Sequence, residues 1–267
     1  MAAALRWSAM RIGVFGAGGR MGAEVCRAVV GDPDLELVAA VDPGCPGRES
    51  IPGGVPIAAT AEVLEEADAE VAVDFTELAG ARENLAWCAS HGVHAVVGTT
   101  GFTEDDMGEL GRLFPLAGGV GCFIAPNFAI GAVLMMRFAE LAAPWFDSAE
   151  VIELHHDGKI DAPSGTAVAT ARRMAEASGE WGPDPTKTEV LPGARGGLGP
   201  AGIRIHSVRL RGLVAHQAVL LGTNGQSLTI RHDSYDRSSF MPGVLLAVKS
   251  VAEHPGVTVG LDRLLGL

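Results

Sequence analysis

The feature that most constrains the fold of this chain is a glycine-rich turn between a short apolar strand pattern and a helix pattern. Residues 11–15 read R-I-G-V-F, residues 16–22 read G-A-G-G-R-M-G, and a helical pattern covers 23–30. Strand, glycine turn and helix in this order are typical of the first unit of a dinucleotide-binding fold. The glycines depart from the common G-x-G-x-x-G spacing at Met21, so a tight turn without a ligand is the alternative.

A second strand pattern strengthens the dinucleotide interpretation. Residues 35–41 end in Asp42, which lies 20 residues after Gly22. An acid at this spacing accepts hydrogen bonds from the adenosine ribose, and its charge opposes a 2′-phosphate. The sequence therefore favours NADH over NADPH, with Arg20 and Arg48 as the alternative phosphate ligands.

Alternation of strands and helices continues to residue 128. Strand patterns at 71–75, 94–97 and 121–124 are separated by helical patterns, which predicts a Rossmann-type, doubly wound parallel sheet of the α/β class. Ligands of such sheets bind at the carboxyl ends of the strands. The G-T-T-G turn at 98–101 is therefore a candidate for the nicotinamide half of the cofactor or a plain helix cap, and Asn127 is a candidate partner for a carboxamide or ribose.

The second half of the chain has a different organisation. Strand patterns at 149–154, 203–210, 215–221 and 227–232 predict a second, α+β domain with a mixed or antiparallel open sheet. We expect this domain to cover 129–238, with 10–128 and 239–267 forming the dinucleotide-binding domain and 1–9 a flexible extension in which Met10 is an alternative start. A long Gly/Pro-rich loop at 181–202 includes Arg195, either an anion ligand or a solvated side chain.

Residues 153–166, E-L-H-H-D-G-K-I-D-A-P-S-G-T, gather chemically active groups in one loop. His155, His156 and Lys159 are proton donors at the end of a strand, and a helix over 166–177 follows, with Ser164 or Thr166 as its N-cap and Gly179 as its C-cap. The first amides of a helix hold a carboxylate or phosphate, and Gly165 lets it approach the backbone.

Two other interpretations of this loop stay open. The histidines and the lysine are structural or solvated in one of them. In the other, His155, His156 and Asp161 bind zinc, although neighbouring residues of a strand point to opposite faces and no further His or Cys cluster completes a shell.

Charge and cysteine usage limit the partners. The formal net charge of -12 opposes binding to nucleic acid or to anionic membranes, which leaves a small molecule as the expected partner. The four cysteines are widely spaced and form no C-x-x-C, as in proteins of the reducing cytoplasm, and no apolar run reaches membrane-spanning length.

Several motifs occur together in this chain: G-A-G-G-R-M-G, D-F-T at 74–76, V-G-T-T-G-F at 97–102, A-P-N-F at 125–128 and E-L-H-H-x-x-K-x-D-A-P-S-G-T at 153–166. Together they resemble the family of the 4-hydroxy-tetrahydrodipicolinate reductases, also called dihydrodipicolinate reductases, of bacterial diaminopimelate and lysine biosynthesis. The resemblance covers residues 10–267, and the segments A-P-N-F-A-I-G-A-V-L and L-T-I-R-H-D-S are most similar to actinobacterial members.

The resemblance implies an NAD(P)H-dependent reductase of a cyclic dicarboxylate, assembled as a homotetramer. It implies that His155 is the proton donor or acceptor, that Lys159 is the catalytic proton donor, and that His156, Gly165 and Thr166 bind the substrate. It also implies cofactor contacts from Gly16, Ala17, Gly18, Gly19, Arg20, Met21, Asp42, Gly98, Thr99, Thr100, Ala125, Pro126, Asn127 and Phe128.

The catalytic loop departs from the family at two positions. Many members carry a second basic or histidine residue before the lysine, whereas this chain has Asp157 and Gly158. The acid either weakens the attraction for a dianion or pairs with Lys159.

Two other functions are compatible with the first domain: an amino-acid dehydrogenase that acts on a substrate such as aspartate, and a regulatory protein that senses NAD without chemistry. The H-H-x-x-K spacing and the titratable groups argue against them.

Overall fold

The chain forms two compact units in a computed structural model that describes residues 9–48, 54–179 and 181–267. The first unit comprises the chain up to Phe128 together with Phe240–Leu267, and the second comprises Ala129–Ser239. The expected boundaries were 128/129 and 238/239. Residues 1–8 of the expected N-terminal extension lie outside the described residues.

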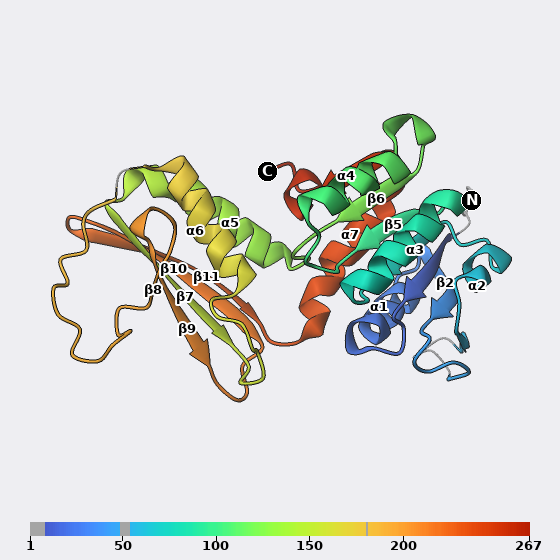
Figure 1. Cartoon of the computed structure of the whole chain (residues 1–267), viewed down its shortest axis with the longest axis horizontal. Coiled ribbons are helices and arrows are strands. Elements are labelled where there is room, and N and C mark those ends of the chain that lie inside the picture. Colours follow the sequence, from blue (N-terminus) through green and yellow to red (C-terminus); the bar gives the residue numbers. More distant parts are fainter. Residues whose placement is uncertain (1–8, 49–53, 180) are drawn as a thin grey trace, which may run out of the picture. The chain divides into compact units, whose positions relative to one another are not determined.

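The first unit is built on a seven-stranded parallel sheet with the strand order β12-β6-β5-β4-β1-β2-β3. Helices lie on both of its faces (Figure 1), so the predicted doubly wound α/β class is confirmed. The strands are β1 (Met10–Phe15), β2 (Leu35–Val41), β3 (Ile57–Ala58), β4 (Val71–Asp74), β5 (His94–Val97), β6 (Gly121–Ile124) and β12 (Gly256–Val259). The helices are α1 (Arg20–Gly31), α2 (Glu62–Glu66), α3 (Leu78–His91), α4 (Glu104–Leu113) and α7 (Met241–Ser250).

Continuous apolar runs explain the position of these strands. Every residue of β4 and of β6 is buried, as expected for strands covered on both faces. Two elements differ from the predictions. Helix α1 begins at Arg20, three residues before the predicted start at 23, and strand β3 was not predicted. The C-terminal strand β12 pairs in parallel with β6 in this sheet.

The second unit contains a five-stranded mixed sheet with the order β11-β10-β7-β9-β8. Strands β7 and β9 are parallel, and the other pairs are antiparallel. Two helices lie side by side on one face of the sheet (Figure 1). The elements are β7 (Ser148–His155), β8 (Gly197–Leu198), β9 (Arg204–Arg209), β10 (Ala215–Thr223), β11 (Gln226–Ser234), α5 (Ile130–Ala142) and α6 (Gly165–Ala177).

The pairing register divides the residues of β7 between the two faces of this sheet. Val151 and Glu153, both fully buried, lie on the face that the helices cover, and Glu150 and Ile152 lie on the opposite, open face. A buried carboxylate on a core strand needs partners that compensate its charge. Glu153 is fully buried, so its carboxylate depends on charged or hydrogen-bonding partners for its stability.

Three predictions in this unit were wrong in detail. Helix α6 ends at Ala177, and its C-cap is Ser178 in extended backbone. Gly179 is therefore not the predicted C-cap, and its backbone is not left-handed. The apolar pattern of residues 130–145 predicts one continuous helix, but α5 ends at Ala142, and Pro144 changes the path to a 3₁₀ turn over Ala143–Trp145. The sheet has five strands instead of four because the two-residue strand β8 pairs with β9.

Candidate active site

The glycine turn of the first unit is closely packed. Gly16 has a φ of 71°, a backbone conformation that glycine adopts without strain. A Cβ on Gly22 would lie 2.1 Å from the carbonyl oxygen of Gly16. A Cβ on Gly18 would lie 2.0 Å from the Cys45 Sγ and 2.9 Å from Asp42 Oδ2. The turn therefore requires glycine at these positions, and its backbone is open to close approach by a ligand.

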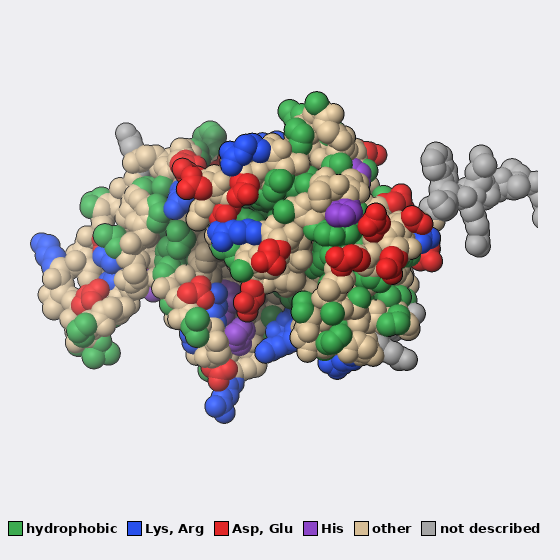
Figure 2. Space-filling view, turned by 45° about the vertical axis from the view of Figure 1, so that its right-hand side comes forward, with side chains coloured by type: hydrophobic (Ala, Val, Ile, Leu, Met, Phe, Trp, Pro, Cys, Tyr) green, Lys and Arg blue, Asp and Glu red, His purple; other side chains and the backbone are tan. Residues whose placement is uncertain are grey.

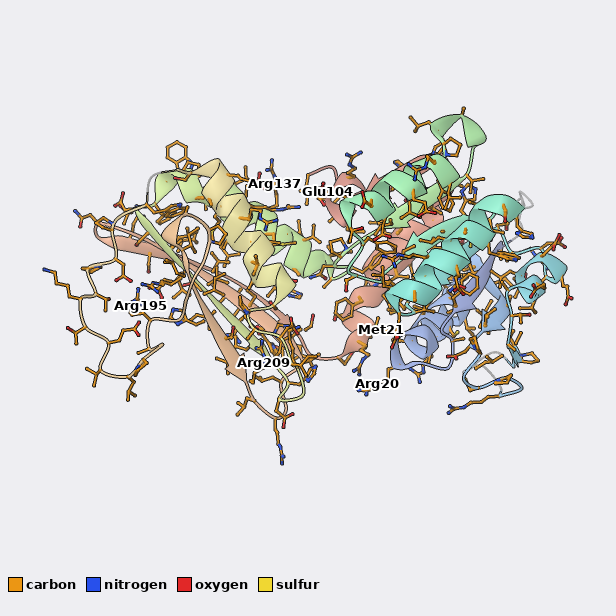
Figure 3. The ribbon with its side chains drawn as sticks, viewed as in Figure 1. Arg20, Met21, Glu104, Arg137, Arg195 and Arg209 are labelled. Atoms are coloured by element: carbon orange, nitrogen blue, oxygen red, sulfur yellow. The ribbon has the colours of Figure 1, made fainter. Side chains whose placement is uncertain are left out.

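Asp42 directs its carboxylate at this turn from the end of β2. Its Oδ2 accepts a hydrogen bond from the Gly18 amide at 3.1 Å, and its Oδ1 accepts one from the Gly44 amide at 2.9 Å. Arg20 and Met21 begin helix α1 beside the turn (Figure 3). Arg20 and Arg48, the alternative phosphate ligands, are both exposed.

A cleft of about 720 Å³ extends from this turn along the edge of the sheet. Among the predicted cofactor residues, Gly16, Gly19 and Asp42 line it. Other lining residues were not predicted as cofactor contacts. Side chains on a helix face carry no cofactor signal in a single sequence, and Gly80, Glu83, Asn84 and Trp87 lie on α3. Thr60 and Thr76 line the cleft from loops.

A buried carboxylate organises the ends of β4 and β5. Asp74 accepts hydrogen bonds from the Thr76 amide at 2.8 Å, the Thr76 hydroxyl at 2.7 Å, the Asn84 side-chain amide at 2.7 Å and the Thr99 hydroxyl at 3.2 Å. Thr99, a predicted cofactor residue, is thus held from inside the protein. Asp74 itself is almost fully buried and does not face a ligand.

The other predicted cofactor residues follow β5 and β6 at the same edge of the sheet. A Cβ on Gly98 would lie 2.0 Å from the ring of Phe75, and the Phe75 and Phe128 rings lie 5.8 Å apart. Ala125 and Phe128 are buried, whereas Thr100 and Pro126 are exposed and Asn127 is half-buried. Gly98, Ala125 and Phe128 therefore have packing roles that their sequence positions did not reveal.

In the second unit, the catalytic loop starts from an acid–histidine pair on β7. His155 Nδ1 lies 2.6 Å from Glu153 Oε2. The two residues share the helix-covered face of the sheet, so the imidazole is half-buried at the strand end. Burial lowers the pKa of His155, and the hydrogen bond to Glu153 opposes this only in part. The imidazole is therefore neutral near pH 7.

Arg209 on β9 compensates the buried charge of Glu153. Its guanidinium donates to both carboxylate oxygens, with Nη1–Oε2 at 2.9 Å and Nη2–Oε1 at 2.8 Å, and the Ser164 amide donates to Oε1 at 3.2 Å. Burial alone would raise the pKa of Glu153, but hydrogen bonds from Arg209, Ser207 and His155 outweigh it and lower the pKa. Glu153 and Arg209 were not predicted as site residues, because they are 56 positions apart.

Lys159 lies in the loop that follows β7. Its Nζ donates to Asp161 Oδ1 at 2.8 Å, and this bond lowers the pKa of Asp161. Asp157 does not pair with the lysine, contrary to one of the two expectations, because Arg211 Nε binds Asp157 Oδ2 at 2.9 Å. The lower tip of this unit accordingly shows acidic, basic and histidine side chains together (Figure 2). His156 is exposed there.

The loop ends at the N-terminus of α6. The Ser164 hydroxyl accepts a hydrogen bond from the Ala167 amide at 3.2 Å, so Ser164 is the N-cap and Thr166 lies in the first turn. A Cβ on Gly165 would meet no atom within 4 Å, so open space lies in front of the first helical residue. This is the geometry of an anion site at a helix N-terminus.

Arg195 is not part of this loop. Figure 3 shows Arg209 among the side chains at the loop end of the sheet and Arg195 on the long loop away from them. Arg195 Nη2 pairs with Glu150 Oε1 at 2.6 Å on the open face, and Arg195 Nε lies 3.6 Å from Asp184. Arg195 is therefore an ion-pair partner of acidic side chains, and neither of its two predicted roles, anion ligand or solvated side chain, fits these contacts.

Among residues 9–48, 54–179 and 181–267, no group of three or more His, Cys, Asp or Glu side chains is arranged to hold a metal ion. In the same residues, no helix is long and apolar enough to cross a membrane.

A glycine turn with its acid on a doubly wound sheet, and a lysine and a histidine beside a helix N-terminus, define a pyridine-nucleotide-dependent oxidoreductase. Two family models match the chain: dihydrodipicolinate reductase, N-terminus, over residues 10–128, and dihydrodipicolinate reductase, C-terminus, over residues 131–265. The chain therefore belongs to the dihydrodipicolinate reductase family.

Individual relatives agree with this assignment over nearly the full length. The chain is 52% identical to the 4-hydroxy-tetrahydrodipicolinate reductase of Corynebacterium aurimucosum over 97% of its own length and 99% of the relative. It is 53% identical to that of Nocardia farcinica, with the same coverage. The structure of a dipicolinate-bound dihydrodipicolinate reductase from Paenisporosarcina sp. TG-14 matches with a TM-score of 0.84 at 40% identity, covering 96% of this chain and 99% of that one. The predicted family is confirmed.

Proposed function

We propose that the chain reduces 4-hydroxy-tetrahydrodipicolinate to tetrahydrodipicolinate, with loss of water, in diaminopimelate and lysine biosynthesis. The observation that carries the proposal is the loop over residues 155–166, in which Lys159 and a Glu153-bound His155 accompany the open N-terminus of α6. Proton-transfer groups beside an anion site suit a cyclic dicarboxylate. Relatives over nearly the whole chain carry the name of this activity.

Binding of the dicarboxylate is assigned to the N-terminus of α6 and its neighbours. The positive end of the helix and its first-turn amides at Gly165 and Thr166 bind one carboxylate. His156 and Lys159 lie in the same loop and favour a dianion locally, although the formal net charge of the whole chain is -12. Because Arg211 binds Asp157, the acid that pairs with Lys159 is Asp161 and not Asp157.

Proton transfer is assigned to Lys159 and His155. A bound nicotinamide supplies a hydride to C4 of the ring. Overall the reaction consumes one hydride and one proton and releases the 4-hydroxyl group as water. Lys159 and His155 are the groups of this loop with protons or lone pairs to exchange at these steps.

Cofactor binding is assigned to the first unit, whose glycine turn fits a dinucleotide. Gly18 and Gly22 leave no room for a Cβ, and helix α1 has a glycine N-cap and no acid in its first turn, so it presents amides to a pyrophosphate. Asp42 supports NADH over NADPH, because a 2′-phosphate would meet its carboxylate. The remaining predicted contacts at 98–100 and 125–128 are assigned to the nicotinamide half.

The protein is a homotetramer of the cytoplasm in this proposal. The open face of the second sheet carries Ile152, Leu154, Val208 and Leu220, none of them fully buried, and pairing of these faces supports a homotetramer. The free cysteines Cys26, Cys45, Cys88 and Cys122 support a reducing cytoplasm. Light scattering of the purified chain tests the tetramer, since a monomer would contradict it.

The experiment that tests the function follows NADH and NADPH oxidation with enzymatically generated 4-hydroxy-tetrahydrodipicolinate. We expect turnover with NADH, and Lys159→Ala should lower kcat by about 10²–10⁴-fold while NADH binding stays the same. Absence of turnover with both nucleotides would refute the proposed function. Equal losses of kcat and NADH affinity would show that Lys159 is not at the reacting centre.

A further inference from the structure

The contact between His155 and Glu153 restricts the position of the imidazole proton. His155 Nδ1 lies 2.6 Å from Glu153 Oε2, a distance that requires one hydrogen between the two atoms. An ionised carboxylate only accepts hydrogen bonds. The proton therefore resides on Nδ1 as long as Glu153 is ionised, and Nε2 of a neutral ring carries a lone pair.

Arg209 keeps Glu153 ionised. A fully buried carboxylate is stable only with charged or hydrogen-bonding partners, and Arg209 binds both of its oxygens. The guanidinium is itself fixed, because Nη2 also donates to the Asp161 carbonyl at 2.6 Å and Nη1 to the Val208 carbonyl at 2.9 Å. Arg209 thus joins β7, β9 and the catalytic loop around one carboxylate.

The charges that face His155 come from three elements. Glu153 on β7 favours the protonated ring, whereas Arg209 on β9 and Lys159 in the loop disfavour it. Burial adds to the effect of the two cations, so the pKa lies below its ordinary value. Near pH 7 the resting ring is neutral and is a proton acceptor.

We propose that Glu153 is a positioning residue that holds His155 as the Nδ1–H tautomer, so that Nε2 accepts the proton removed when the substrate loses water, and Lys159 donates the proton that leaves with the hydroxyl. In this step the C–H bond beside the imine carbon breaks and its proton passes to Nε2. The electron pair forms the C=C bond to C4, the C4–O bond breaks, and the hydroxide takes a proton from Lys159 as water.

The positively charged His155 then stores the proton that reduction needs. After hydride addition to C4, the ring carbon between C4 and the imine carbon, which lost its proton in the first step, takes this proton back from Nε2. Solvent then restores the proton of Lys159. The sum is one hydride and one proton consumed and one water released, as the overall reaction requires. This assignment rests on the proposed function, and its new element is Glu153 as the residue that sets the tautomer of His155.

Replacement of Glu153 by glutamine tests the assignment. Arg209 would retain the amide oxygen of Glu153→Gln, so the amide NH₂ would face His155 and bind Nδ1 as an acceptor, which inverts the tautomer. We expect ¹⁵N NMR of histidine-labelled enzyme at pH 7.5 to show His155 protonated at Nδ1 in the wild type and at Nε2 in the variant. We expect kcat to fall by about 10²–10⁴-fold with NADH affinity unchanged.

Glu150→Gln is the matched control. Glu150 lies on the same strand and pairs with a histidine and an arginine, His206 Nε2 at 2.7 Å and Arg195 Nη2 at 2.6 Å, but on the opposite face of the sheet. We expect this variant to retain the His155 tautomer and the wild-type kcat. His155→Gln identifies the His155 signals in the spectra.

Three results would overturn the proposal. In the first, wild-type His155 is protonated at Nε2 or at both nitrogens at pH 7.5. In the second, the Glu153→Gln enzyme retains the wild-type kcat. In the third, the Glu150→Gln control loses as much kcat as Glu153→Gln. If Glu153→Gln does not fold, the wild-type spectrum and Glu153→Asp decide, because the aspartate retains the charge and should retain the tautomer. The spectrum needs no turnover, so it separates failure of this assignment from failure of the proposed function.

Discussion

Asp74 and Thr99, 25 positions apart in the chain, are joined by a hydrogen bond of 3.2 Å from the Thr99 hydroxyl to Asp74 Oδ1. The same oxygen accepts from the Thr76 amide and hydroxyl, and Oδ2 accepts from Asn84. One buried carboxylate therefore holds the ends of β4 and β5 and the first part of α3 together. The turn that follows β5 carries residues 98–100, which are among those assigned to the nicotinamide half of the cofactor.

Asp74→Asn should weaken both the fold and nucleotide binding. Asparagine offers one acceptor oxygen where four donors now converge, so at least one buried donor loses its partner, at a cost of about 1–3 kcal/mol. We expect chemical denaturation to show this loss and NADH titration to show a raised Kd.

Thr99→Ala is the comparison for this variant, because it removes a single donor and leaves the carboxylate bound by the others. We expect it to lose less stability than Asp74→Asn. If both variants unfold like the wild type and bind NADH equally well, Asp74 does not organise the two strand ends.

The strand and helix order of the first unit was predictable because its signals are local. Buried strands such as β4 and β6 are continuous apolar runs, and the glycine turn occupies one short segment. Strands β3 and β8 were missed since two residues have no periodicity, and only pairing with a neighbour defines them. The C-cap of α6 was misplaced because Gly179 fits the usual signal, yet the chain leaves the helix in extended backbone at Ser178.

The candidate site was predictable in part for the same reason. His155, His156, Lys159 and Gly165 form one motif in sequence, whereas Glu153 acquires its role through a partner on another strand. No local pattern relates Glu153 to Arg209 or Asp157 to Arg211, because these pairs form only after β7 and β9 align in parallel. Long-range ion pairs are therefore what a single sequence did not reveal.

Gly22→Ala should disrupt the dinucleotide turn. The new Cβ would lie 2.1 Å from the Gly16 carbonyl oxygen, which is a backbone atom that cannot rotate away. We expect a loss of about 1–3 kcal/mol in the free energy of unfolding, as for other overpacked sites. Calorimetric titration should show no measurable NADH binding.

Gly31→Ala is the control on the same helix. A Cβ at Gly31 would meet no atom within 4 Å, so we expect unchanged NADH binding and a gain of roughly 0.5–1 kcal/mol in stability. Equal effects of the two substitutions would show that close packing at Gly22 is not what the turn requires.

Asp42→Asn should shift cofactor preference toward NADPH. The asparagine retains an oxygen for the Gly18 or Gly44 amide but removes the charge that opposes a 2′-phosphate. We expect the ratio of kcat/KM for NADPH to that for NADH to rise by about tenfold, or ~1.4 kcal/mol. Glu36→Gln removes an exposed charge from the same strand and should leave the ratio unchanged. A wild-type enzyme with a large preference for NADPH would contradict the role of Asp42.

His94 should make the stability of the first unit depend on pH. Its Nδ1 accepts a hydrogen bond from the Gly121 amide at 2.9 Å, which ties β5 to the start of β6. Burial lowers the pKa of His94 below 6.5, while Glu70 opposes the shift. Since the folded-state pKa is below the unfolded value, the unfolded chain binds more protons as the pH falls below about 6.5. The contribution of His94 to stability is therefore present at pH 7.5 and is lost progressively toward acid.

His94→Asn isolates this contribution, because the asparagine oxygen replaces Nδ1 as an acceptor but does not titrate. We expect the free energy of unfolding of the wild type to fall more between pH 7.5 and 5.5 than that of the variant. Other histidines whose pKa values burial lowers, His155 and His232, titrate in both proteins, so their effects cancel in the comparison. Urea denaturation at several pH values measures the difference. Parallel curves for the two proteins would mean that the buried acceptor at position 94 does not control the acid sensitivity of the sheet.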